Sequence, residues 1–295
     1  MGGFPRIYRE IQATAHFLHK AGEQDTFGRC VSIFSVTSLR SQALLPLTTT
    51  DPNDKAALTR QIDLGAPVDP AARLEPGAPI PGRPGRPQLL PHTELKARSM
   101  RTVEGRAALI HALAHIELNA IDLALDIVWR FPDLPEDFYR QWMGVAQEEA
   151  LHFELLRDHL RSLGFDYGDF PAHNTLWEMA EKTRHDLLAR LALVPRTLEA
   201  RGLDASPPIK AKLTSAGDRR AGEILDIILR DEIGHVALGN RWYRWLCAER
   251  GFDPVATYPQ LAEQYGAPRP RGPFNLEARR AAGFQEDELA ALIAD

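Results

Sequence analysis

Two short motifs in the sequence combine residue types that bind metal ions. The first is Glu149-Ala-Leu-His152 and the second is Glu232-Ile-Gly-His235. In a helix, residues three apart lie on the same face, so each motif directs one carboxylate and one imidazole to the same side. The repeated motif therefore predicts a metal site to which two separate helices each contribute a Glu-His pair.

Both motifs lie on apolar stripes with helical periodicity. The first stripe contains Trp142, Val145 and Leu156, and the second contains Ile228 and Trp242. Such stripes face a core, where a carboxylate without a partner is costly and a multivalent cation can compensate several of them. A single Glu-x-x-His motif on an exposed helix face would be expected by chance. The alternative to a metal site is a helical bundle that binds no metal. Two copies on core stripes favour the metal site.

Two further glutamates fit the same scheme, because bundles that hold two metal ions take one glutamate from each of two other helices. Glu117 is the only glutamate in the centre of its predicted helix, on a stripe with Ile110, Leu113, Ala120, Ile121 and Ala124. Glu199 shares a face with Leu188, Ala192 and Pro195, which favours it over Glu178 and Glu181. Glu117 lies 32 residues before Glu149, and Glu199 lies 33 residues before Glu232.

Long helices are expected to position these residues. Apolar periodicity predicts helices over residues 100–130, 136–164 and 218–250, and a third helical region within residues 175–201. Proline and glycine mark their ends, and Gly202 is expected to cap the third region. The fold class is therefore all-α, a four-helix bundle.

The connections add two expectations. The segment after Gly164 looks too short to cross the bundle, so residues 176–183 are expected to form a separate short helix. Pro195 is expected to kink the third helix, and residues 207–216 must then run alongside the bundle.

The chain divides into four parts by composition. Residues 1–64 are expected to form an arm that is weakly structured or has short helices, and residues 65–92 a strap rich in proline and glycine. The bundle takes residues 93–250, and residues 251–295 form a C-terminal extension.

Composition limits the function classes. The formal charge of −5 gives no general reason to expect binding to nucleic acid or to acidic membranes. The two cysteines, Cys30 and Cys247, are far apart and suit neither a disulfide scaffold nor a thiolate metal site. No signal peptide or membrane span is apparent, and a cytoplasmic location is expected.

The sequence resembles the ferritin-like di-iron carboxylate superfamily over residues 94–250. More narrowly, the segments HALAHIELNAID, RFPDLPEDF, EEALHF, LVPRTLEARGLD and ILRDEIGHVALGNRWY resemble a bacterial family known as domain of unknown function 455, which is similar to di-iron tRNA hydroxylases. The resemblance implies two iron ions, with Glu149 and Glu232 as bridges between them. It implies six ligands in all, which are Glu117, Glu149, His152, Glu199, Glu232 and His235.

The donor set suits iron or manganese, whereas structural zinc would more often use sulfur, so iron is expected and a mixed manganese–iron pair is an alternative. Glu148 and Asp231 lie four residues before the motif histidines and are expected to accept the second ring N–H of a ligand histidine, unless they are solvated helix charges. His111 and His115 are expected beside the ligands or exposed, rather than among the ligands.

The function expected first is an oxidoreductase that activates oxygen and hydroxylates or oxidises an organic substrate, which is a small molecule or a nucleoside. Such an enzyme also needs an electron donor. Iron storage or detoxification is an alternative, which the extensions at both ends disfavour. A tRNA-modifying hydroxylase is a second alternative, suggested by the resemblance and by two basic clusters: Arg73, Arg83, Arg86, Lys96, Arg98 and Arg101 in and after the strap, and Arg269, Arg271, Arg279 and Arg280 in the tail. A homodimer is left open.

Overall fold

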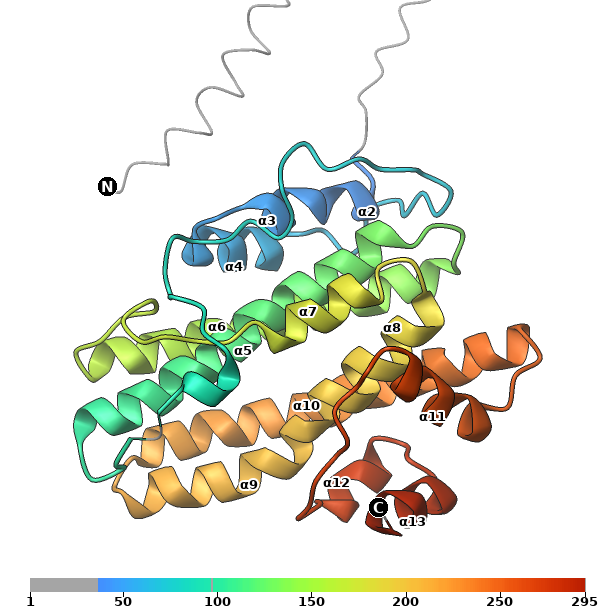
Figure 1. Ribbon diagram of the computed structural model, residues 1–295. Coiled ribbons are helices and arrows are strands. Elements are labelled where there is room, and N and C mark those ends of the chain that lie inside the picture. Colours follow the sequence, from blue (N-terminus) through green and yellow to red (C-terminus); the bar gives the residue numbers. More distant parts are fainter. Residues whose placement is uncertain (1–36, 97, 295) are drawn as a thin grey trace, which may run out of the picture. The chain divides into compact units, whose positions relative to one another are not determined.

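The computed structural model describes residues 37–96 and 98–294, and this part of the chain is built from helices (Figure 1). Its only β pairing is an isolated bridge between Leu89 and Ala172. Most of the arm predicted over residues 1–64 lies outside the described residues, and so does Cys30. The helices are α2 (Leu39–Gln42), α3 (Leu44–Thr48), α4 (Pro52–Arg60), η1 (His92–Glu94), α5 (Val103–Arg130), α6 (Glu136–Ser162), α7 (Thr175–Lys182), α8 (Leu187–Leu193), η2 (Val194–Glu199), α9 (Ala200–Ser215), α10 (Arg219–Glu249), α11 (Pro254–Gln264), α12 (Leu276–Ala281) and α13 (Glu286–Ala294).

The first half of the bundle is the hairpin of α5 and α6, which run side by side (Figure 1). The Thr102 hydroxyl caps α5 by accepting from the Gly105 N–H at 3.0 Å. The turn after α5 is fixed by the buried Tyr139, whose hydroxyl accepts from Leu134 N–H and donates to the Phe131 carbonyl. Both helices match their predicted ranges to within a few residues.

The second half pairs α10 with the α8–η2–α9 segment. Asp218 caps α10 by accepting from Ala221 N–H, so the helix begins where its predicted range of 218–250 begins. The kink predicted at Pro195 takes the form of a π-helical segment, η2, which ends at Glu199. Gly239 of α10 lies against this segment, because a Cβ there would come within 2.6 Å of the Pro195 ring. The close approach brings α10 and Glu199 together.

The helix end predicted at Gly202 is wrong. α9 continues through Gly202 to Ser215 and contains Pro207 and Pro208. Proline at 207 removes the helical donor for the Leu203 carbonyl, and the Asn275 side chain of the C-terminal extension donates to that carbonyl instead, at 3.2 Å. A helix that local rules would end is thus maintained by a distant part of the chain. Residues 207–215 run alongside α10 within this helix, consistent with the expected course of that segment.

The connection between the two halves is the loop at residues 163–174 followed by the short helix α7, close to the prediction for residues 176–183. His111 of α5 holds the loop, because its Nε2 accepts from Gly168 N–H at 2.9 Å. The strap also holds it, through backbone bonds from Ala172 N–H to the Gln88 carbonyl and from Leu90 N–H to the Ala172 carbonyl.

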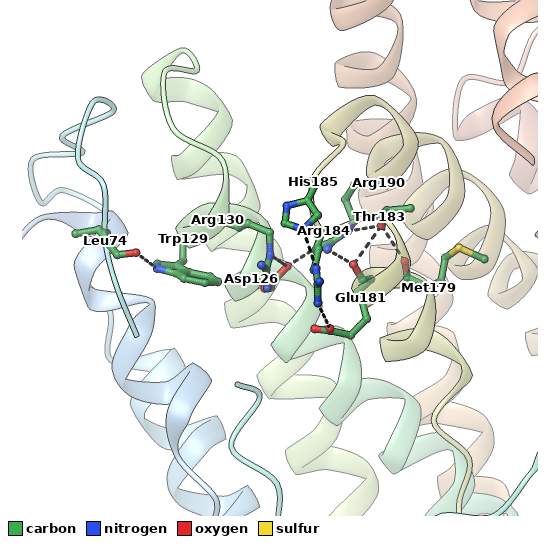
Figure 2. Close-up of polar contacts among 11 residues, drawn as sticks. Leu74, Asp126, Trp129, Arg130, Met179, Glu181, Thr183, Arg184, His185 and Arg190 are labelled. Atoms are coloured by element: carbon green, nitrogen blue, oxygen red, sulfur yellow. Dashed lines mark hydrogen bonds and ion pairs between the residues drawn. The ribbon is translucent and has the colours of Figure 1, made fainter. Parts of the chain in front are cut away.

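A buried ion pair joins the two halves near the end of α5. Arg190 of α8 donates to Asp126 of α5 at 2.5 Å, and Arg130 donates to the same carboxylate (Figure 2). The Arg190 guanidinium also donates to the Thr183 hydroxyl and the Ala180 carbonyl. Because the pair is buried, removing one partner is expected to cost about 3–5 kcal/mol.

The short helices α2–α4 and the strap pack on the hairpin and share its hydrophobic core. Arg40, fully buried in α2, donates to the carbonyls of Val128 and Trp129 at the end of α5 and to three carbonyls of the strap. Lys55 of α4 forms a buried ion pair with Asp122 of α5. In Figure 2, the Trp129 indole donates to the strap carbonyl of Leu74.

The C-terminal extension is attached to the π segment. Glu288 of α13 accepts hydrogen bonds from Arg196 of η2 and from Arg244 of α10, at 2.5 and 2.8 Å. The Arg196 guanidinium lies over the rings of Tyr243, Tyr258 and Phe284. This contact helps to fix the backbone that carries Glu199.

Helix α5 is long and apolar enough to cross a membrane by length and composition, contrary to the expectation from the sequence. Its most apolar window has a mean hydropathy of 1.4, and 72% of that window is buried inside the protein. The apolar side chains of α5 therefore form part of the core, which explains the composition of this helix.

Candidate metal centre

Four of the predicted ligands meet in one buried cluster. Glu117 of α5, Glu149 and His152 of α6, and Glu232 of α10 each offer a ligand atom within 4.8 Å of the others. His152 Nδ1 lies 3.3 Å from both Glu117 Oε2 and Glu149 Oε2. The cluster could hold a metal ion, and it draws on three of the long helices.

The two remaining predicted ligands border this cluster. His235 Nδ1 lies 3.0 Å from Glu149 Oε1 and 3.6 Å from Glu232 Oε1. Glu199 stands at the end of η2, and burial raises its pKa well above the usual value, with further increases from the charges of Glu232 and Glu149. His235 thus adjoins the cluster, and Glu199 lines the same cavity as Glu117 and Glu232, although neither belongs to the tightest group.

The outer ring nitrogens of the two histidines are held by carboxylates of the opposite helix. His152 of α6 has its Nε2 at 3.1 Å from Asp231 of α10, and His235 of α10 has its Nε2 at 2.7 Å from Glu148 of α6. A carboxylate at Nε2 favours a ring hydrogen on that nitrogen, so Nδ1 is the ring atom that faces the glutamates and would be free to bind a metal. The carboxylates thus orient both imidazoles with Nδ1 toward the glutamates.

These two carboxylates differ in exposure. The Asp231 side chain is 14% exposed and the Glu148 side chain 53% exposed. Arg230 donates to both oxygens of Asp231, and its hydrogen bond together with that of His152 outweighs burial and lowers the Asp231 pKa. Asp231 is therefore the better ordered of the two positioning groups.

The pKa values of two of the clustered glutamates and of both histidines are shifted in the direction expected where buried carboxylates lack a compensating cation. Burial raises the pKa of Glu117 and Glu232, and the neighbouring Glu149 raises both further. Burial opposes the imidazolium form of His152, but its hydrogen bonds with Glu117 and Glu149 raise its pKa to about 11. His235 shifts in the same direction because of Glu149. The metal-free centre thus retains protons that a cation would displace.

Hydrogen bonding within the site shows whether its residues fit a metal ion, because several buried atoms of the predicted ligands make no well-aligned hydrogen bond. The atoms Glu117 Oε2, Glu199 Oε2, Glu232 Oε2 and His235 Nδ1 are buried and make no well-aligned hydrogen bond within the described chain, although Glu117 Oε2 lies 3.3 Å from His152 Nδ1 and His235 Nδ1 lies 3.0 Å from Glu149 Oε1. Unpartnered buried polar atoms are rare in native proteins and need an explanation. These four atoms, all carboxylate oxygen or imidazole nitrogen, belong to predicted ligands, and their chemistry fits a metal centre with hard and intermediate donors.

A cavity of about 410 Å³ opens beside the centre. Glu117, Glu199 and Glu232 lie in its wall, together with buried apolar side chains that include Leu198 and Ile228. Its volume lies within the range of about 300–1,000 Å³ that is typical of small-molecule sites. The centre therefore adjoins a space that a small organic molecule can enter.

His115 lies near Glu117 but does not join the centre. Its Nδ1 hydrogen-bonds with the Tyr167 hydroxyl at 2.8 Å, and its Nε2 lies 3.0 Å from the His173 carbonyl and 3.1 Å from Asn119 Nδ2. Both ring nitrogens are directed to the connecting loop or its own helix. His115 thus orders the wall of the cavity rather than the ligands.

Comparison with known proteins adds the family. The family described as "Protein of unknown function (DUF455)" matches residues 48–290. The chain belongs to the DUF455 family. A relative from Haemophilus influenzae, named "Uncharacterized protein", is 44% identical over 268 residues, which cover 86% of this chain and 93% of that protein. No solved structure matches the chain. All six candidate ligands of this DUF455 chain fall inside the matched range.

Reasoning from the sequence did not predict that three further polar side chains line the cavity, although it named one of them, Arg271, in a basic cluster of the tail. His173, Arg201 and Arg271 come from the loop before α7, from α9 and from the C-terminal extension. Arg201 lay at the end of the predicted third helical region, and periodicity along that helix gave no sign that this residue borders a cavity. Arg271 has no local signal because its place depends on the fold of the extension.

Proposed function

We propose that this protein is a ferritin-like di-iron carboxylate oxidoreductase that activates oxygen to hydroxylate or oxidise an organic substrate. The observation that carries the proposal is the buried cluster of Glu117, Glu149, His152 and Glu232, beside which His235 lies 3.0 Å from Glu149 and Glu199 lines the same cavity as Glu117 and Glu232. Two divalent ions would balance the formal charge of the four carboxylates. A bundle without metal would have to keep these groups buried with no such compensation.

Six side chains would hold the irons, and these are Glu117, Glu149, His152, Glu199, Glu232 and His235. Glu149 lies near both histidines, so it would be the most central of the residues that hold the metal. The chemistry that a pair of irons supplies when bound is the two-electron reduction of oxygen.

The remaining residues prepare the centre for that chemistry. Asp231 and Glu148 keep the Nε2 proton on each imidazole, so that Nδ1 stays free for metal. Apolar side chains such as Leu198, Leu225 and Ile228 exclude water from the inner cavity wall. A substrate there would lie against Glu117, Glu199 and Glu232.

Iron loading tests the proposal. The purified chain is incubated with iron(II) in the absence of oxygen, desalted and analysed for bound metal. Oxygen is then admitted, and oxidation of the bound iron is followed by absorbance. We expect about two irons for each chain and a spectral change that depends on oxygen. A chain that retains no transition metal would refute the proposal.

Iron storage uses the same centre but a different assembly, and the cavity favours an organic substrate over it. Measuring the size of the assembly separates the two functions, because storage requires a hollow shell.

The tRNA alternative depends on free positive charge, and several of the basic residues considered for it already have partners: Arg73 with Asp133, Arg98 with Glu104, Arg279 with Asp204 and Arg280 with Glu286. Salt-dependent binding of tRNA would support that alternative instead.

A further inference from the structure

The cavity beside the centre is graded from a buried apolar interior to a polar rim. Among its lining residues, Ala120, Leu198, Leu225 and Ile228 are at most 6% exposed and lie with the glutamates. The lining residues that are exposed to solvent include Ile116, Arg201, Pro208, Arg271 and Pro273. A ligand that fills this space must therefore have an apolar body at one end.

The rim carries positive charge that the described chain does not neutralise. Within residues 37–96 and 98–294, Arg201 and Arg271 have no carboxylate at ion-pair distance and donate no hydrogen bond. The nearest acidic candidate in the rim, Asp204, is already engaged, because it accepts from Arg279 at 2.6 and 3.0 Å and from Asn275 N–H at 2.9 Å. Two guanidiniums are thus available at the mouth of the cavity.

We propose that the substrate is a small amphiphile whose terminal anionic group, a carboxylate or a phosphate, binds Arg201 and Arg271 while its apolar body extends toward Glu117, Glu199 and Glu232. The inference rests on the proposed function in that the apolar end is the part that reacts. Guanidinium groups bind both kinds of oxyanion through parallel hydrogen bonds, so the two anion types share one chemistry.

The charge of the centre fixes the orientation of the ligand. With two divalent ions bound, the four negative charges of the glutamates would be balanced, so the loaded centre would offer no net positive charge to an anion. The rim has two positive charges and no free carboxylate. An anionic group is therefore more stable at the rim, and the apolar interior is left for the hydrocarbon part.

The volume limits the size of the ligand. At about 30 Å³ for each water-sized group, a cavity of 410 Å³ takes roughly a dozen such groups. An unbranched acid of about ten carbons matches this space, so decanoate is a suitable probe. Decyl phosphate and decanol carry the same chain with a different end group.

Calorimetric titration tests the inference with these three probes, below their micelle concentrations, on metal-free and on iron(II)-loaded protein. We expect decanoate or decyl phosphate to bind about tenfold more tightly than decanol, with each removed methylene weakening binding about fourfold. The better of the two anions identifies the end group. Binding of the anions should persist in the metal-free protein.

Variants locate the anionic group. The double variant Arg201→Gln/Arg271→Gln should weaken binding of the anions about tenfold and leave decanol unchanged, since one exposed charge pair contributes up to about fivefold. Arg220→Gln, an exposed arginine of α10 away from the cavity, is the matched control and should change neither. Circular dichroism of each variant confirms that the fold is retained, as expected for exposed positions.

Three results would overturn the inference: equal binding of decanol and the anions, no effect of the double variant, or binding of the anions only when iron is present, which would place their end group on the metal. Iron content is measured on the same samples. About two irons for each chain together with any of these results leaves the proposed function standing. Absence of bound iron refutes that function whatever the probes do.

Discussion

Replacement of His111 by glutamine should make the protein more resistant to acid. His111 is fully buried in α5, and its Nε2 accepts from Gly168 N–H, so the ring is neutral there. Burial lowers its pKa from 6.5 to about 4, although Asp169 acts in the opposite direction. Protonation would break the bond to Gly168 and place a charge in the core.

The sign and size of the effect follow from the linkage between proton binding and folding. Between pH 6.5 and about pH 4 the unfolded chain binds a proton at His111 that the folded chain does not, so the free energy of unfolding falls as the pH falls. The full contribution of His111 is present above pH 6.5. The pKa difference corresponds to a loss of about 3 kcal/mol on reaching pH 4, at about 1.36 kcal/mol for each pKa unit.

His111→Gln removes the titration and keeps an acceptor for Gly168. Urea unfolding, followed by circular dichroism with a chelator present, gives the free energy of unfolding of both proteins from pH 7 to pH 4. The difference between them should move by about 3 kcal/mol in favour of the variant as the pH falls. His185→Gln, at an exposed position, is the control and should move the difference little. Parallel stability curves for wild type and His111→Gln would refute the reasoning, because the buried centre is common to both and cancels.

Three further outcomes can be measured. Glu149→Gln, which removes a charge close to both motif histidines, should reduce iron bound at a fixed free iron(II) concentration by tenfold or more, as metal analysis after equilibrium dialysis would reveal. Asp231→Asn should weaken iron(II) binding about 10–100-fold, because the His152 imidazole loses the carboxylate that orients it. Asp226→Asn, on the exposed side of α10, is the control and should leave iron(II) affinity unchanged. Equal iron(II) affinities for the two variants would contradict the positioning role of Asp231. Asp126→Asn should lower the free energy of unfolding by about 3–5 kcal/mol in urea, because it leaves Arg190 buried without its ion-pair partner, and a loss below about 1 kcal/mol would show that water or Arg130 compensates.

The sequence by itself determined the helical pairs and the residues that face the core. A spacing of three residues places Glu149 with His152 and Glu232 with His235 on one face, and the apolar stripes decide that this face is buried. The proline and glycine pattern set most helix ends to within a few residues. These features are local, since they depend only on backbone geometry and on neighbours one or two turns away.

Only the tertiary structure decided which side chains contact one another across the helices. Glu148 and Asp231 were expected to hold ring nitrogens, but each holds the histidine of the opposite helix, which depends on how α6 and α10 are aligned. The course of α9 past Gly202 depends on Asn275, more than 70 residues away, because its side chain donates to the carbonyl that Pro207 leaves free.

The cavity was beyond local rules for the same reason. Its rim joins Arg201 of α9 to Arg271 of the C-terminal extension, and no spacing along the chain relates the two. Residue type and periodicity report what a helix presents to its surroundings, whereas a cavity is the space left where several elements fail to meet. Its shape and its charge are therefore set by the packing of distant segments.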